Sequence, residues 1–232
     1  MNLESYKAVF FDVGGTLLKV HPSVGEVYAK HARRFGFEGS GEELNHEFAL
    51  AWKELGGLES LGKQSGPDVE QQFWRTIVKR VFHAHGGLVN FDDYFNIIYK
   101  VFLSAENWKV YDDVLESGIL EKLKSRGTTL GVISNWDSRL EGILEATSLA
   151  SYFDFILAST VVGSAKPDRK IFDKALHLAS VKPSLACHIG DEPETDILGA
   201  RRAGIDAILL DRKNTHQVRD GIVIRSFNQL RA

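Results

Sequence analysis

Five short apolar runs, separated by segments with helical periodicity, constrain the fold of this chain more than any other feature. Each run is four to six residues long, a length typical of strands buried on both faces. Strands that alternate with helices predict a parallel sheet covered on both sides, which is an open, Rossmann-like α/β fold. The predicted strands are Ala8–Phe11, Thr129–Ile133, Phe153–Ala158, Ala186–Ile189 and Ala207–Leu210.

Two segments between the later runs show the helical pattern. In DRKIFDKALHLA, residues 168–179, the apolar positions fall on one helical face, and Asp168 is placed as an N-cap. These apolar positions are Ile171, Phe172, Ala175, Leu176 and Ala179. In ETDILGARRAG, residues 194–204, Gly204 is placed to end a short helix.

The middle of the chain has a different pattern. Between Pro22 and Ser104 no convincing strand appears, and a Gly-rich stretch, GGLESLGKQSGPD, predicts a mobile loop. We therefore expect an α/β core built from residues 1–19 and 105–232, with an all-helical domain of residues 20–104 inserted after the first strand. This insertion should move relative to the sheet and control access to it. Its predicted helices are Val24–Phe35, Glu42–Leu55, Val69–His85 and Phe91–Leu103.

Composition limits the classes of function. The 232 residues fit one domain with a modest insertion, and 44% of them are hydrophobic, as in an ordinary globular protein. A net charge of −3 gives no sign of a nucleic-acid-binding face. The single cysteine, Cys187, excludes an intrachain disulfide, and we expect it to be a small buried hydrophobe. Without a signal peptide or a membrane-length apolar run, the expected location is cytoplasmic, with no membrane partner.

Polar side chains follow four of the predicted strands at the points where these strands end. Because ligands bind at the carboxyl ends of the strands in open α/β sheets, we expect these side chains to share one crevice. Taken singly, each has a plain structural explanation, such as a turn former or a surface loop. The residues, in strand order, are Asp12 and Thr16, then Ser134-Asn135, then Lys166, then Asp191, Glu192, Glu194 and Asp196.

The residue types in this set complement one another. A carboxylate that attacks phosphorus approaches an anion, so a cation and hydrogen-bond donors must surround the phosphoryl oxygens. Lys166, the hydroxyls of Thr16 and Ser134, and the Gly-rich backbone supply such groups. The acids around Asp191 would repel a phosphate unless a cation lay between them. Their hard oxygen ligands suit Mg²⁺.

The order and spacing of these residues resemble the haloacid dehalogenase superfamily, whose members are mostly Mg²⁺-dependent phosphatases. The family's first motif, D-x-D-G-T, stands here as Asp12-Val13-Gly14-Gly15-Thr16. Its second and third motifs match Ser134 and Lys166, and its fourth, G-D-x(4)-D, matches Gly190-Asp191 to Asp196. The helical insertion is similar to the family's cap domain. Within the superfamily the chain is similar to the subgroup related to the fly rhythmically expressed gene 2 product.

The resemblance implies a role for each residue of the set. Asp12 would be the nucleophile that forms an aspartyl-phosphate, with Ser134 and Lys166 completing the catalytic group. The substrate, a small phosphorylated metabolite, would bind to Thr16, Gly15, Ser134, Asn135 and Lys166. Mg²⁺ would be held by Asp12, the main-chain carbonyl of Gly14, Asp191 and Asp196.

Residue 14 departs from the family pattern. The family's phosphatases carry there an aspartate that protonates the leaving oxygen and later activates water, whereas Gly14 has no side chain. General acid/base catalysis contributes ~10²–10⁴-fold, so its loss raises the barrier by roughly 3–5 kcal/mol. His21, near the start of the insertion, is a candidate proton donor, although a polar linker histidine is the plainer interpretation.

Three interpretations remain open. The favoured one is a phosphatase with weak or specialised activity. The second is a 2-haloacid dehalogenase, whose leaving halide needs no proton. Such enzymes work without metal, and the acidic fourth motif argues against this. The third is a catalytically silent binding module, which Gly14 favours and the intact set around Asp12 does not require. A phosphonatase is less favoured still, because no lysine of the insertion can be singled out for a Schiff base. Neither the exact substrate nor the oligomeric state is indicated.

Overall fold

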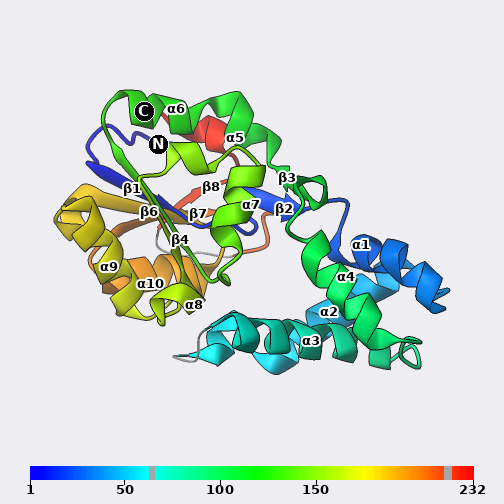
Figure 1. Cartoon of the computed structure of the whole chain (residues 1–232). Coiled ribbons are helices and arrows are strands. Elements are labelled where there is room, and N and C mark those ends of the chain that lie inside the picture. The colour runs from blue at the N-terminus through cyan, green and yellow to red at the C-terminus, as the bar shows by residue number, and fades with distance from the viewer. Residues whose placement is uncertain (63–65, 217–220) are drawn as a thin grey trace.

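A six-stranded sheet forms the centre of the computed structural model, which describes residues 1–62, 66–216 and 221–232 (Figure 1). The strand order is β5-β4-β1-β6-β7-β8, and every neighbouring pair is parallel. The predicted α/β class is confirmed. The strands are β1 Ala8–Phe11, β4 Thr129–Ser134, β5 Phe155–Ala158, β6 Ala186–Gly190, β7 Asp206–Leu210 and β8 Ile222–Ile224.

The five predicted strands are all present, with two differences from the prediction. Strand β5 begins at Phe155 rather than Phe153 because a 3₁₀ turn, Ala150–Tyr152, precedes it, and the Asp154 carboxylate accepts the Leu130 N–H at 2.8 Å. Strand β8 was not predicted. It is three residues long and lies at the edge of the sheet, with its first two residues exposed, so it carries no buried apolar pattern.

Helices cover both faces of the sheet, as predicted. One face packs against α5 (Asp112–Ser117), α6 (Ile119–Ser125) and α7 (Leu140–Ala146). The other face packs against α9 (Arg169–Ala179) and α10 (Gly199–Arg202), with the short α8 (Ser159–Val162) beside them. The predicted apolar face of α9 is buried, and Asp168 caps this helix by accepting the Lys170 N–H at 3.0 Å. Residues 193–198 form a π-helical turn before α10, and Gly204 follows it with φ of 80°.

Four helices form a unit that stands beside the sheet (Figure 1). They pack around their own buried core, in which Tyr28, Ile77 and Tyr94 are almost fully covered. Among the described residues between 22 and 104 there is no strand, as predicted. The helical unit comprises α1 Val24–Ala32, α2 Gly41–Leu55, α3 Pro67–His83 and α4 Phe91–Val101.

Two features of this region were not predicted. An antiparallel ribbon of β2 (Leu18–Val20) and β3 (Trp108–Val110) lies where the chain leaves the sheet and where it returns. Part of the Gly-rich stretch, residues 63–65, lies outside the described residues. Its described part contains a 3₁₀ helix, Leu58–Leu61, in which Leu58 is buried.

Two further observations concern composition. Cys187 is buried in β6, and burial raises the pKa of its thiol, as fits a small hydrophobe. Of the helices in the described part of the chain, none combines the length and apolarity needed to cross a bilayer.

Candidate active site

The register of three neighbouring strands brings the motif residues together. Phe11 at the end of β1 lies opposite Val132 on β4 and Ile189 on β6. Since the three strands are parallel, the residues that follow them meet at one edge of the sheet. Asp12 follows β1, Ser134 ends β4, and Asp191 follows β6.

Asp12 is buried and held in one orientation by two donors. Its Oδ1 accepts a hydrogen bond from the Ser134 hydroxyl at 2.8 Å and one from Lys166 Nζ at 2.6 Å. Burial raises the pKa of Asp12, and the charge of Lys166 opposes that rise. The carboxylate therefore lies at the strand end beside a fixed cation, as a nucleophile that approaches an anion requires.

Lys166 is almost completely buried and lies between two carboxylates. Its Nζ is 2.6 Å from Asp12 Oδ1 and 2.5 Å from Asp196 Oδ1. Burial alone favours the neutral amine, but the two carboxylates raise the pKa of Lys166 and keep it charged. Asn135 fixes its main chain, because Asn135 Oδ1 accepts the Lys166 N–H at 2.8 Å and Nδ2 donates to the Lys166 carbonyl at 2.9 Å.

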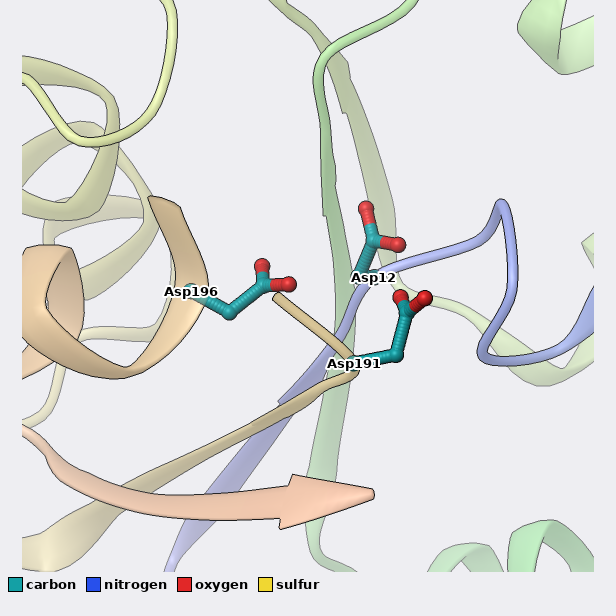
Figure 2. A group of neighbouring side chains, drawn as sticks. All are labelled: Asp12, Asp191 and Asp196. Carbon is teal, nitrogen blue, oxygen red and sulfur yellow. The ribbon is translucent and has the colours of Figure 1, made fainter. Parts of the chain in front are cut away.

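Three aspartates form a cluster suited to a divalent cation (Figure 2). One oxygen each from Asp12, Asp191 and Asp196 lies within 4.8 Å of the others. Asp191 Oδ1 also accepts the Thr16 hydroxyl at 3.0 Å. Carboxylates grouped this closely present the hard oxygen ligands that Mg²⁺ prefers.

Asp191 and Asp196 differ in their surroundings. Burial and the negative charges of Asp12 and Asp196 raise the pKa of Asp191 to about 8. Burial also acts on Asp196, but Lys166 and a His188 Nε2 contact at 2.8 Å outweigh it and lower the pKa of Asp196. Asp196 Oδ2 further accepts the Glu192 N–H at 3.0 Å. Of the three aspartates, Asp191 is the one with no cation among its hydrogen-bond partners in the described residues, and it therefore holds its proton most tightly in the absence of a bound metal.

A cavity of about 780 Å³ opens in front of this cluster, between the sheet edge and the helical unit. Asp12, Ser134 and Lys166 lie on its floor together with Asp191. A family model described as haloacid dehalogenase-like hydrolase matches residues 6–204, which include all of these residues. The chain belongs to the haloacid dehalogenase-like hydrolases. The family resemblance predicted from the motifs is thus confirmed.

Two relatives support this membership, and a solved structure shares the fold. The chain is 37% identical over 209 residues to haloacid dehalogenase-like hydrolase domain-containing protein 3 of Danio rerio, covering 89% of this chain and 85% of the relative. It is 31% identical over 224 residues to the rhythmically expressed gene 2 protein of Drosophila melanogaster, covering 92% and 86%. A structure titled as that of a dehalogenase superposes with a TM-score of 0.74 at 22% identity, covering 97% and 95%. The last comparison shows the fold alone.

The two glycines of the first motif of this haloacid dehalogenase-like hydrolase differ in their constraints. Gly15 has φ of 78°, and a Cβ there would overlap the Asp191 carboxylate, so only glycine fits. Gly14 has no left-handed φ, and the nearest atom that a Cβ would meet is Trp136 Cζ3, at 3.3 Å. The Trp136 ring therefore lies over the position where the family's phosphatases carry their acid.

Thr16 and Gly15 make hydrogen bonds that hold Asp191 and the first-motif loop in place. The Thr16 hydroxyl donates to Asp191, and the Gly15 N–H donates to the Leu18 carbonyl at 2.9 Å. Gly15 lines the cavity, whereas the buried Thr16 is not among its lining residues. Their role in binding substrate stays a prediction.

Arg212, which the sequence pattern did not single out, holds the first-motif loop through its main chain. Its guanidinium donates to the Thr16 carbonyl at 2.8 Å and pairs with Asp113 at 2.5 Å. It also lies 4.0 Å above the centre of the Tyr111 ring. Arg212 comes shortly after β7, so the rule that polar residues at strand ends share one crevice, applied to a fifth strand, would have pointed to it.

The loop that follows β4, residues 135–139, contacts the helical unit as well as Lys166, the neighbour of Asp12. Asn135 Nδ2 donates to Glu59 Oε1 at 2.6 Å, and the Trp74 Nε1–H donates to Asp137 Oδ2 at 2.6 Å. Glu70 on α3 is almost fully buried and accepts hydrogen bonds from Ser138. We call residues 135–139 the docking loop.

The position of His21 agrees with the plainer interpretation, a polar linker histidine, rather than with a proton donor. His21 is exposed, and it is not among the residues that line the cavity. Of the described residues of the helical unit, Glu59 is the one that brings a carboxylate to the cavity wall. Sequence offered no signal for this, because Glu59 lies in the Gly-rich stretch.

Proposed function

We propose that this chain is a Mg²⁺-dependent phosphatase that forms an aspartyl-phosphate on Asp12 and acts on a small-molecule phosphate ester. One observation carries the proposal. A buried carboxylate, held by Lys166 and Ser134, shares its cluster with Asp191 and Asp196. A cation-dependent phosphoryl transfer uses every member of that arrangement.

The chemistry follows from the positions of these groups. Asp12 attacks phosphorus, the bond from phosphorus to the ester oxygen breaks, and that oxygen leaves with the electron pair. Lys166 and the Ser134 hydroxyl bind the phosphoryl oxygens and stabilise their charge. Water then hydrolyses the acyl phosphate, which releases inorganic phosphate and restores Asp12. Bound Mg²⁺, held by Asp12, the Gly14 carbonyl and Asp191 with Asp196 orienting, would neutralise phosphoryl charge.

A dehalogenase is the second candidate, favoured by Gly14 and the Trp136 ring above it, since a leaving halide needs no acid. That reaction would leave Asp191 and Asp196 without a chemical role. A screen of phosphate esters, acyl phosphates and chloroacids, each with Mg²⁺ and with chelator, separates the two. We expect Mg²⁺-dependent phosphate release and no halide release. Halide release that continues in the presence of chelator would contradict the phosphatase proposal and favour the dehalogenase.

Asp191→Asn should weaken Mg²⁺ binding, because it removes one charge from the cluster while keeping the shape of the side chain. The measurement is the Mg²⁺-dependent rise in thermal stability, which reaches about 2.7 kcal/mol at a cation concentration 100 times Kd. Glu194→Gln is the matched control, since Glu194 is exposed in the same segment. An Asp191→Asn variant that is stabilised as strongly as the parent would remove Asp191 from the cation site.

Mg²⁺ affinity should rise with pH up to about 8. The pKa of Asp191 is raised to about 8 in the folded protein, so below that pH a proton occupies the carboxylate and competes with the cation. The slope of log affinity against pH should approach one between pH 6 and 8 and flatten above it. A pH-independent affinity over this range, measured by calorimetry, would contradict the protonation of Asp191.

The same shift has a consequence for the cation-free protein. The folded state binds the Asp191 proton more tightly than the unfolded state, in which an aspartate has its ordinary pKa. This group therefore lowers stability as pH rises from about 4 to about 8. Added Mg²⁺ should reduce that loss, which thermal unfolding across this pH range would detect.

A further inference from the structure

All four tryptophans of the chain line the cavity in front of Asp12. Trp52 and Trp74 come from the helical unit, Trp108 from the β2–β3 ribbon, and Trp136 from the docking loop. All four are half-buried, so part of each ring remains accessible. Exposed aromatic surface gathered inside one cavity indicates a ligand that covers it.

Hydrogen bonds to nearby residues fix the indole N–H groups of two of these rings. The Trp74 N–H donates to Asp137 at 2.6 Å, and the Trp108 N–H donates to the Phe102 carbonyl at 2.8 Å. The rings also pack in pairs, with centroids 5.8 Å apart for Trp52 and Trp74 and 5.2 Å apart for Trp108 and Trp136. The indoles are therefore held in place and present apolar ring surface to the cavity.

The one guanidinium among the lining residues adds little net charge. Arg139 forms an ion pair with Asp137, with Nη2 2.6 Å from Oδ2 and Nε 3.0 Å from Oδ1. Its guanidinium lies over the Tyr99 ring, 4.2 Å from the centroid. Asp137 is fully buried, so little water screens its attraction to Arg139. Apart from Lys166 at the site itself, the other cation among the described lining residues is Lys19, which is exposed, with its Nζ 5.4 Å from the centroid of the Tyr111 ring.

The direction of the reaction places the leaving group in this region. In an in-line displacement the leaving oxygen points away from the attacking Asp12, and from the sheet edge that direction leads toward the helical unit. A volume of about 780 Å³ falls in the range of pockets that enclose drug-sized ligands, and a phosphoryl group fills only a small part of it.

We infer that the substrate is a phosphate monoester of a bulky aromatic alcohol, whose ring packs among the four tryptophans while its phosphoryl group meets Asp12. The phosphoryl part of this inference rests on the proposed phosphatase function, whereas the aromatic part rests on the cavity lining. Aromatic rings prefer offset and edge contacts with other rings, and such contacts add to the gain from apolar burial.

Binding of non-hydrolysable phosphonates in the presence of Mg²⁺ tests the inference, with intrinsic tryptophan fluorescence as the readout. Methylphosphonate, a dihydroxybutyl phosphonate and 2-naphthylmethylphosphonate share one head group. We expect the naphthyl compound to bind tighter than methylphosphonate by on the order of 50-fold, from the apolar area that it buries. A dihydroxybutyl compound that binds as tightly as the naphthyl one would overturn the aromatic assignment.

Two variants localise the effect. Trp52→Leu should reduce the preference for the naphthyl compound at least 5-fold and leave methylphosphonate affinity unchanged. Phe91→Leu is the matched control, because Phe91 is a partly buried aromatic of the helical unit outside the cavity lining. Equal losses in both variants would contradict the inference.

The phosphonate-free alcohol, 2-naphthylmethanol, separates this inference from the function on which it rests. Binding of the alcohol without any binding of the phosphonates would uphold the aromatic cavity and overturn the phosphatase. Phosphonate binding with no preference for the naphthyl group would uphold the phosphatase and overturn the aromatic substrate.

Discussion

Asp12→Asn should abolish phosphate release from every ester, by roughly 10⁴-fold or more, because the amide cannot form the aspartyl-phosphate. The substitution keeps the size of the side chain and the hydrogen bond from Ser134. It removes one of the two carboxylates beside Lys166 and leaves the pair with Asp196 at 2.5 Å. The protein should therefore still fold with Lys166 charged.

Acid quenching during turnover provides the decisive measurement for this variant. The parent should carry a covalent phosphoryl group on the peptide that contains Asp12, and the variant should carry none. Asp173→Asn is the control, since Asp173 lies on the exposed side of α9 in a surface ion pair with Arg169. Phosphate release by a folded Asp12→Asn variant at a rate near the parent's would exclude Asp12 as the nucleophile.

Gly14→Asp should speed the slow phase of turnover by ~10²-fold or more, the lower end of what a positioned base supplies. With no side chain at residue 14, attack on an activated ester needs little help, whereas hydrolysis of the acyl phosphate lacks a base. The parent should then show a burst with aryl or acyl phosphates, followed by slow turnover. Stopped-flow measurement of the two phases distinguishes these steps.

The backbone permits this substitution. Gly14 is not in the left-handed region, and the closest obstacle is Trp136 Cζ3, 3.3 Å from the added Cβ, so the indole must shift by a few tenths of an ångström. Gly14→Asn is the matched control, because it has the same size and no basic carboxylate. Thermal stability of both variants should be measured first. If Gly14→Asn accelerates turnover as much as Gly14→Asp, the gain comes from displacing the indole.

A carboxylate on the cavity wall, Glu59, is the alternative source of the base that is missing at residue 14. Glu59 lies on the cavity wall and accepts a hydrogen bond from Asn135 at 2.6 Å. A parent enzyme without a burst, slowed ~10²-fold by Glu59→Gln, would place the base in the helical unit and contradict our account of Gly14. Glu54→Gln, at an exposed position on α2, would serve as its control.

The sequence predicted the fold and the meeting of the motif residues for a physical reason. Parallel strands buried on both faces leave continuous apolar runs, and their carboxyl ends share one edge of the sheet. Asp12, Ser134 and Asp191 follow three adjacent strands, so their proximity was predictable once the strands were recognised. Strand β8 and the β2–β3 ribbon escaped prediction because three-residue strands leave too short a pattern.

Contacts between segments that are distant in the sequence could not be predicted from the sequence pattern. Arg212 reaches the Thr16 carbonyl, and His188 reaches Asp196, through packing that no local spacing reveals. The assembly of Trp52, Trp74, Trp108 and Trp136 around one cavity is of the same kind. Each position has an ordinary helix, strand or loop context, and only the tertiary structure brings the rings together.

The docking loop has a consequence for the engineering of this chain. Glu70 of α3 is 1% exposed and depends on Ser138 and Thr160 for its hydrogen bonds. A buried carboxylate deprived of such partners is strongly destabilised. A chimera that joins the helices of this chain to the sheet of a relative must therefore carry residues 135–139 and Thr160 along with the helices. The helical unit and the segment that follows β4 are then exchanged together, as one module.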